Sequence, residues 1–266
     1  MYELKYHKPA SLSDAAKALS GAEEGKILSG GQTLLPTMKQ HLAAPTDLVD
    51  VRAIQEMSGI CAGDGTVSVG AATPHVDVAG NADVRAHIPA LGLLADGIGD
   101  PAVRAVGTIG GSIANNDPAA DYPAAVLGLG ATVVTNAREI PADAFFQGMF
   151  TTALDEDEIV TAVRFPVPAR AGYAKFPNPA SRYAMVGVFV AETGDGVRVA
   201  VTGAGEDGVY RDAELEAALG SDFSSAAVDG VASDPRGMLD DIHASAVYRA
   251  HLVNVMAKRA VAAATG

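Results

Sequence analysis

The chain has 266 residues, 48% hydrophobic and 19% charged, which is enough apolar material for a folded core and too little charge for disorder. Nineteen Lys and Arg against 32 Asp and Glu give a net charge of −13. This balance opposes binding to nucleic acid or to an anionic membrane surface, because both need clustered basic side chains. The single cysteine, Cys61, excludes an intrachain disulfide and an iron–sulfur cluster held by four cysteines of this chain.

Cys61 is expected to be buried and inert, as free cysteines usually are. The first six residues lack the apolar core of a signal peptide, and the longest apolar runs are far below the ~18 residues that a membrane span needs. We therefore expect a cytoplasmic protein without an intrinsic membrane segment. The length suggests two compact domains, since a domain typically has ~100–200 residues.

The first fifty residues alternate between strand and helix signals. Ser11 or Asp14 is a suitable cap for a helix that continues to Leu19. The pattern further predicts strands at residues 4–6, 26–28 and 47–51, and one or two helical turns at residues 34–40.

Residues 60–72 form two short runs around Asp64-Gly65, the strongest short signal of a β-hairpin. A helical stretch is predicted at residues 77–96, broken near Pro89. Residues 97–121 are rich in Gly, Asn and Asp and are predicted to form a long irregular segment. Such segments in compact domains are usually functional or disordered, and the regular glycines and few charges favour function here.

The rest of the sequence divides at residues 166–172, a stretch with prolines and a glycine that we predict to be a domain boundary. Before it, the pattern predicts a helix at residues 123–129 and strands at 131–135 and 159–165. After it, the pattern predicts strands at residues 173–176, 185–192 and 197–202 and helices at 213–219, 224–232 and 244–264.

The segment Ser29-Gly30-Gly31-Gln32-Thr33-Leu34-Leu35 lies between a predicted strand and a helical turn. Its glycines permit a positive φ, so that successive backbone N–H groups can point outward, an arrangement that suits a diphosphate. Gln32 and Thr33 can add side-chain hydrogen bonds. By itself, a Gly-Gly turn between a strand and a helix is more often structural.

The segment Gly107-Thr108-Ile109-Gly110-Gly111-Ser112-Ile113-Ala114-Asn115 also places glycines beside small hydroxyl residues, and its glycines let a cofactor approach the main chain. A turn-rich loop is the other interpretation. A Lys-Ser or Lys-Thr pair follows neither segment, which argues against a P-loop. Together the two segments fit the clamping of one long diphosphate ligand from two sides.

Other motifs are weaker evidence of a binding or catalytic site. Gly203–Gly208 matches GxGxxG, but Glu206 and Asp207 would put negative charge where a pyrophosphate must bind, and the required βαβ context is missing. The histidines have no metal-site spacing, and no nucleophile–base pair stands out. Tyr183, beside Arg182, can flank a planar ring, although packing is the commoner role of tyrosine.

The segments SGGQTLLPTMK, LVDV, GAATPH and above all IGDPAVRAVGTIGGSIANNDPAADYPAA resemble the flavoprotein (medium) subunits of the molybdenum hydroxylase family. The likeness is greatest to those of aerobic carbon monoxide dehydrogenases, and xanthine dehydrogenases have an equivalent FAD domain. It runs from Tyr6 to about Val190, and the acidic, helical tail resembles the family's C-terminal flavoprotein domain.

The resemblance implies an α+β protein in two domains. Residues 1–168 would form a FAD-binding fold of the vanillyl-alcohol oxidase (PCMH) type, with subdomains at about 1–55 and 56–168. Residues 169–266 would form a C-terminal domain with a small antiparallel sheet and helices.

The resemblance also implies a set of FAD-binding residues. The family's two glycine loops map to residues 29–35 and 107–112, and Asp121 matches an acidic position that contacts the cofactor. Ile98 and Val160 match apolar positions that line the flavin or the adenine. Lys175 matches a lysine near the isoalloxazine ring, where a cation stabilises reduced, anionic flavin. The expected cofactor-binding residues are thus Ser29, Gly30, Gly31, Gln32, Thr33, Leu34, Leu35, Ile98, Gly107, Thr108, Gly110, Gly111, Ser112, Asp121, Val160 and Lys175.

The family loop often reads GGHS or GGQS, so Gln32-Thr33 is a mild departure that leaves the backbone contacts intact. No histidine stands in either loop, and non-covalent FAD is therefore expected. Neither catalytic residues nor a metal site are expected in this chain.

The family passes electrons from a molybdenum cofactor through two [2Fe–2S] clusters to FAD. One cysteine and 266 residues leave no place for either group, so an iron–sulfur small subunit and a molybdopterin large subunit are expected as partners. The complex would be a heterotrimer or a dimer of heterotrimers that gives its electrons to an external acceptor. Two alternatives are a self-sufficient FAD-dependent oxidoreductase of the same fold and a non-enzymatic flavin-binding assembly protein.

Overall fold

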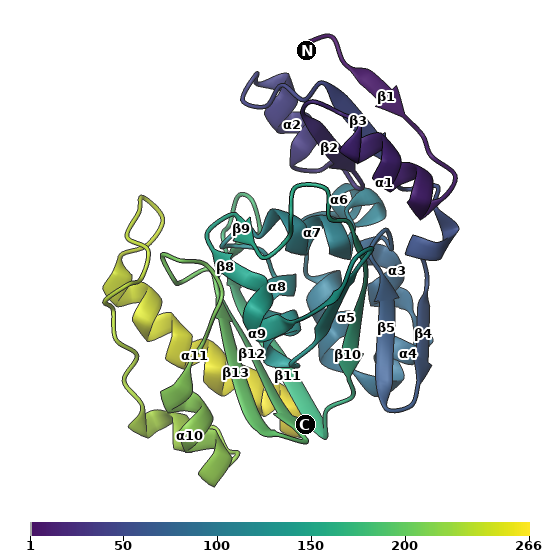
Figure 1. Ribbon diagram of the computed structural model, residues 1–266. Coiled ribbons are helices and arrows are strands. Elements are labelled where there is room, and N and C mark those ends of the chain that lie inside the picture. The colour runs from purple at the N-terminus through teal and green to yellow at the C-terminus, as the bar shows by residue number, and fades with distance from the viewer. Residues whose placement is uncertain (1) are drawn as a thin grey trace.

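The computed structural model describes residues 2–266, and in it three main β-sheets follow one another along the chain (Figure 1). The first is a three-stranded parallel sheet in the order β1-β3-β2. It comprises β1 (Lys5–His7), β2 (Gly25–Leu28) and β3 (Asp47–Asp50). Parallel neighbours need crossover connections, which contain α1 (Leu12–Ser20) and α2 (Leu34–Lys39). Helix α1 begins where the Ser11 hydroxyl accepts a hydrogen bond from the Asp14 amide at 3.2 Å, as predicted.

The second sheet is antiparallel and has the order β4-β5-β10-β6-β7. Its strands are β4 (Ile60–Gly63), β5 (Thr66–Gly70), β6 (Thr132–Thr135), β7 (Glu139–Pro141) and β10 (Val160–Pro166), preceded by the 3-10 turn η1 (Gln55–Met57). The predicted hairpin joins β4 to β5, and Asp64 and Gly65 have φ of 50° and 71°. Two positive φ values match the right-handed twist of a two-residue hairpin.

Six short helices lie between β5 and β6. They are α3 (His75–Gly80), α4 (Ala82–His87), α5 (Pro89–Asp96), α6 (Pro101–Val106), α7 (Ile109–Asn115) and α8 (Tyr122–Gly128). The helical stretch predicted at residues 77–96, with its break near Pro89, is confirmed, but it has a further break at Asn81, whose side chain accepts from the amides of Asp83 and Val84 and starts a new helix.

The prediction of an irregular segment at residues 97–121 was wrong, because this segment contains α6 and α7. The Asp100 carboxylate accepts from the Val103 amide at 2.9 Å, and the Thr108 hydroxyl accepts from the Gly111 amide at 3.2 Å. The polar residues that read as loop formers are thus helix caps.

The third sheet is antiparallel, with the order β11-β12-β13-β14. Its strands are β11 (Arg170–Pro177), β12 (Ala184–Thr193), β13 (Gly196–Thr202) and β14 (Tyr210–Arg211). The remaining elements are α9 (Ala142–Phe145), β8 (Phe146–Gly148), β9 (Thr151–Thr152), α10 (Ala213–Ser221), the 3-10 turn η2 (Ala227–Gly230) and α11 (Ala246–Thr265). The helix predicted at residues 224–232 is therefore reduced to η2.

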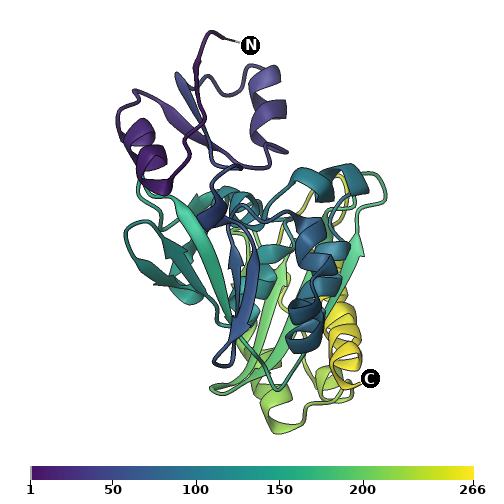
Figure 2. The same cartoon turned by 90° about the vertical axis from the view of Figure 1, so that its right-hand side faces the viewer.

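Helices cover both faces of the third sheet, with α8 on one side and the long α11 on the other (Figure 2). Strand β12 is accordingly buried over its first eight residues, a pattern typical of a strand packed on both faces. One apolar core extends from the second sheet through α8 to Phe189, Ala191 and Ala200 of the third sheet. A second core lies between the third sheet and the helices α10 and α11.

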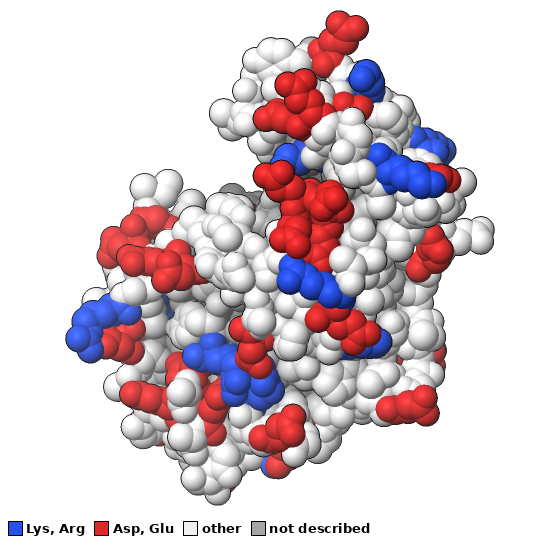
Figure 3. All heavy atoms as spheres, in the orientation of Figure 1, with Lys and Arg blue, Asp and Glu red and all other residues white. Residues whose placement is uncertain are grey.

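The surface of the protein exposes many acidic side chains (Figure 3) and its cysteine. Cys61 lies exposed on the edge strand β4, so the expectation of a buried thiol was wrong. Acidic side chains cover more of the face in Figure 3 than basic ones, in keeping with the net charge of −13. No helix within residues 2–266 is long and apolar enough to cross a membrane.

Candidate functional site

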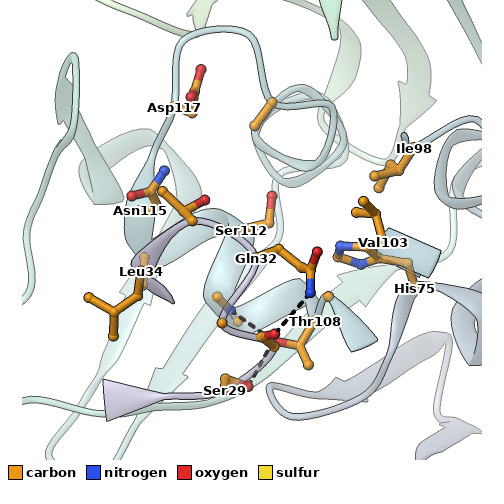
Figure 4. Close-up of a pocket in the computed structure, with 18 of the residues that line it drawn as sticks. Ser29, Gln32, Leu34, His75, Ile98, Val103, Thr108, Ser112, Asn115 and Asp117 are labelled. Atoms are coloured by element: carbon orange, nitrogen blue, oxygen red, sulfur yellow. Dashed lines mark hydrogen bonds between the residues drawn. The ribbon is translucent and has the colours of Figure 1, made fainter. Parts of the chain in front are cut away.

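A cavity of about 830 Å³ lies between the N-terminal three-stranded unit and the helices that precede β6. The segments that follow β2, α5 and α6 supply its walls (Figure 4), and the segment that follows β11 completes them. All of the cofactor-binding residues expected from the sequence line this cavity except Leu35 and Lys175. The volume lies within the range of about 300–1,000 Å³ that is typical of ligand pockets.

The first glycine loop presents a row of backbone donors to this cavity. Gly31 has a φ of +67°, and the N–H groups from Gly30 to Leu34 have no hydrogen-bond acceptor among residues 2–266. Alternating left- and right-handed backbone conformations turn successive N–H groups to one side and create an anion-binding concavity. The loop therefore has the geometry to bind a diphosphate through its main chain.

The second glycine loop differs from the first, because several of its backbone amides already donate hydrogen bonds within the protein. Ile109 N and Gly110 N donate to the carbonyls of Thr73 (3.3 Å) and Ala71 (2.9 Å). Gly110 and Gly111 lie in the first turn of α7 with a helical backbone, unlike Gly31 of the first loop. This loop presents side chains, including those of Ser112 and Asn115, to the cavity instead (Figure 4).

The two loops meet directly at the base of the cavity. Ser29 Oγ and Thr108 Oγ1 are 2.8 Å apart and share a hydrogen bond (Figure 4). A Cβ on Gly30 would lie 2.5 Å from the carbonyl oxygen of Val106, which only glycine avoids. The sequence places these loops almost eighty residues apart, and this contact makes them one site.

Apolar side chains line the cavity in two groups. Ile98 and Val103 come from the α5–α6 region, and Leu154, Ile159 and Val160 come from the segment that enters β10. Flat aromatic rings are bound mainly by such apolar surfaces. The cavity thus offers two apolar regions and a set of main-chain donors, which suits a dinucleotide with a ring system at each end.

Asp121 lines the cavity and is paired with Lys175 behind it. Lys175 Nζ lies 2.9 Å from Oδ1 of Asp121, and the Tyr173 hydroxyl donates to the same carboxylate at 2.5 Å. Burial raises the pKa of Asp121, and the Lys175 charge and the Tyr173 hydrogen bond oppose this rise. Lys175 also donates to the carbonyls of Gly97 (2.8 Å) and Arg182 (3.2 Å).

The segment 180–183 forms part of the cavity wall. Tyr183 is 46% exposed there, so of its two suggested roles the position beside a planar ring fits the structure better than packing in the core. Arg182 has a φ of 63°, and Lys175 holds its carbonyl. The cofactor-binding residues expected from the sequence did not include Arg182, Asn115 or His75, although the structure places all three in the lining of the cavity. GAATPH marked the segment of His75, but no signal in the sequence gave that side chain a role.

The GxGxxG match at Gly203–Gly208 lies elsewhere. It follows β13 and leads into the two-residue strand β14, so it lacks the strand–turn–helix arrangement of a dinucleotide fingerprint.

The fold and the paired glycine loops define a dinucleotide-binding protein, and comparison with known proteins identifies its family. Residues 2–168 match the model for the FAD-binding domain in molybdopterin dehydrogenase, and the chain belongs to this family. The carbon monoxide dehydrogenase medium chain of Hydrogenophaga pseudoflava is 33% identical, over 98% of this chain and 96% of that protein. The nicotine 6-hydroxylase medium subunit of Paenarthrobacter nicotinovorans is 34% identical, over 97% and 96%.

Solved structures agree with the α+β fold expected from the sequence. A chain of the reconstituted CO dehydrogenase from Oligotropha carboxidovorans superimposes with a TM-score of 0.91 at 31% identity, covering 99% of both chains. A chain of quinoline 2-oxidoreductase from Pseudomonas putida 86 superimposes with a TM-score of 0.89 at 28% identity. The likeness spans both the FAD-binding part and the C-terminal part.

Proposed function

We propose that this chain binds FAD in the cavity and serves as the flavin-carrying electron-transfer subunit of a molybdenum hydroxylase. The observation that carries the proposal is the first loop, whose row of backbone donors faces a cavity with two apolar regions. The near full-length match to proteins named as medium chains or subunits supports the subunit role. FAD supplies an acceptor of two electrons that can pass them on one at a time.

The residues around the cavity would contact different parts of FAD. The N–H groups from Gly30 to Leu34 would hold the diphosphate, and the side chains of Ser112 and Asn115 would add hydrogen bonds from the opposite wall. Ile98 and Val160 would pack against ring systems of the cofactor. Lys175 would act mainly through Asp121 and the carbonyl of Arg182, which it fixes in place at the cavity wall.

The substrate would be chosen elsewhere in the complex. Relatives with the same domain are named for carbon monoxide, nicotine and glyceraldehyde. Substrates this different in size and polarity do not share one pocket, so a partner with the molybdenum cofactor would select them. An iron–sulfur small subunit would deliver the electrons to FAD, in a heterotrimer or a dimer of heterotrimers in the cytoplasm.

The domain division near residues 166–172 is part of the same proposal. Its support is the family match, which ends at residue 168, although the first apolar core continues across this point to Phe189. The C-terminal part would then be packed firmly against the FAD-binding part.

FAD titration and substrate-driven reduction test the proposal. The full chain, alone and assembled with the iron–sulfur and molybdopterin subunits, should bind one FAD, measured by quenching of flavin fluorescence. Absence of binding in both preparations would refute the proposal. Rapid substrate oxidation by the chain alone would favour the self-sufficient oxidoreductase instead.

A further inference from the structure

His75 is a buried polar side chain in the cavity wall that the proposed function has not used. It is the first residue of α3, and its backbone N–H donates to the carbonyl of Gly107 at 2.9 Å. Only 5% of the residue is exposed, and the ring reaches into the cavity beside Val103 and Ile98 (Figure 4).

The ring nitrogens lack the partners that a buried histidine normally has. Nδ1 is fully buried and has no hydrogen-bond partner among residues 2–266. Nε2 also forms no hydrogen bond within these residues, but it is not one of the fully buried atoms, so it is the ring nitrogen that a ligand in the cavity can reach. The aromatic neighbour, Tyr122, offers a tilted ring at 5.2 Å between centroids and no hydrogen bond to the imidazole.

The surroundings keep this imidazole neutral. Burial, and then the positive charge of Arg104, lower the pKa of His75 to about 4. A neutral imidazole carries one proton, on either Nδ1 or Nε2. A buried N–H without an acceptor is rarer than an acceptor without a donor, so the proton belongs on Nε2.

Gly107 makes room for this nitrogen. A Cβ on Gly107 would lie only 2.7 Å from Nε2 of His75, closer than real side chains approach. Nε2 therefore lies against the second glycine loop, at the wall where the proposed cofactor passes. A single N–H directed into the cavity at this point needs an acceptor from the ligand.

We propose that His75 is a further FAD-binding residue, whose Nε2–H donates a hydrogen bond to an oxygen or nitrogen acceptor of the cofactor. This inference rests on the proposed function, because FAD must occupy the cavity. It gives the GAATPH segment a direct contact with the ligand.

Amide substitutions distinguish the two ring nitrogens. In His75→Gln the side-chain N–H₂ reaches about the position of Nε2, whereas in His75→Asn it reaches only the position of Nδ1. FAD affinity should therefore fall about tenfold or more in His75→Asn and His75→Phe and be largely kept in His75→Gln, since a lost hydrogen bond leaves its partner unsatisfied. The affinity is measured by fluorescence titration on the full chain, alone and in the assembled complex.

Tyr122→Phe is the matched control. Its hydroxyl has no partner within residues 2–266, and the side chain touches His75 without lining the cavity, so its FAD affinity should equal that of the unmodified chain. Circular dichroism melts of the cofactor-free variants test whether the fold is kept.

A second measurement does not depend on substitution. In ¹⁵N-histidine NMR spectra, the His75 ring should be the Nε2–H tautomer, and its Nε2 resonance should shift when FAD is added. A resonance that stays in place, or a folded His75→Phe chain with unchanged FAD affinity, overturns the inference. An unmodified chain that binds no FAD refutes the proposed function instead.

Discussion

Lys175 Nζ lies 2.9 Å from Oδ1 of Asp121, and the two side chains are 10% and 4% exposed. The positive charge that the family resemblance implies near the flavin is thus compensated by a carboxylate that itself lines the cavity. What the flavin would meet is a buried ion pair and not a lone cation. Breaking such a pair is costly, because it leaves one charge buried without its partner.

Lys175→Met should therefore destabilise the chain more than the loss of one surface contact would. We expect the free energy of unfolding to fall by about 3 kcal/mol or more, because Asp121 stays buried and unpaired. Urea unfolding of the cofactor-free chain measures this. The double variant Asp121→Asn, Lys175→Met should recover much of the loss, and a single variant as stable as the unmodified chain would contradict the expectation.

The flavin potential gives a second readout of the same pair. In the FAD-loaded complex, Lys175→Met should lower the potential if Asp121 remains ionised, since a negative charge then faces the flavin without compensation. The double variant should have a potential close to that of the unmodified complex. Equal shifts in the single and double variants would show that Lys175 acts on the flavin directly.

The two neighbouring glycines of α7 should respond differently to substitution. A Cβ on Gly110 would lie 2.6 Å from the Cβ of Ala71, so Gly110→Val should unfold or strongly destabilise the chain. A Cβ on Gly111 meets only Thr108 Oγ1 at 3.1 Å and Ser29 Cβ at 4.0 Å, next to the cavity. Gly111→Val should keep the fold and weaken FAD binding at least tenfold by filling cofactor space.

Thermal melts and FAD titration separate the two effects. Gly220→Ala, where the new Cβ has no neighbour within 4 Å, is the control for both measurements. Gly205→Ala is unsuitable, because its Cβ would lie 2.7 Å from the carbonyl oxygen of Gly208. Unchanged FAD affinity in folded Gly111→Val would show that the second loop is only structural.

FAD should be held without a covalent bond. Neither glycine loop contains a histidine or cysteine that could carry the flavin covalently. Acid precipitation of the FAD-loaded protein should leave the flavin in the supernatant. Flavin that stays with the pellet would reveal an attachment that the loops do not suggest.

How far the sequence predicts this site depends on what each residue does. The first loop was predictable, because Gly30-Gly31 after a strand fixes a turn whose amides point outward. The third sheet was predictable for a similar reason, since the apolar run of β12 and its turn at Asp195-Gly196 are local signals.

The other features of the site could not be predicted, because they depend on contacts between segments that lie far apart in the sequence. The amides of α7 are taken by Ala71 and Thr73, and this pairing leaves no trace in the sequence of either segment. The same holds for the pairing of Asp121 with Lys175, 54 positions later. Asp100 and Thr108 cap helices, but their sequence signal resembles that of a loop. Short polar side chains bond to nearby backbone N–H groups both in turns and at the start of helices.

Stability of the cofactor-free chain should fall between pH 7 and pH 4 because of His75. Its pKa is about 4 in the folded chain and 6.5 ordinarily, so the unfolded chain takes up a proton first as the pH falls. The stabilising contribution is present above pH 6.5 and is lost progressively toward pH 4, by about 2 kcal/mol at pH 5. His75→Gln should show a correspondingly smaller loss of unfolding free energy over this range, measured with urea at each pH, whereas equal losses in both chains would contradict the low pKa.

Electrons should reach the flavin of this chain only through its partner subunits. The chain alone should not oxidise carbon monoxide, aldehydes or purines, because its single cysteine, Cys61, cannot hold an iron–sulfur cluster and residues 2–266 contain no cluster of metal ligands. When the iron–sulfur and molybdopterin subunits are added, the substrate of the complex should bleach the flavin absorbance near 450 nm in stopped-flow experiments, about as fast as the complex turns over. Folded Gly111→Val should assemble normally and yet lose this bleaching in proportion to its missing FAD, which separates cofactor binding from assembly. Substrate turnover by the isolated chain at enzymatic rates would show that the relay role is wrong and that the chain is a self-sufficient oxidoreductase.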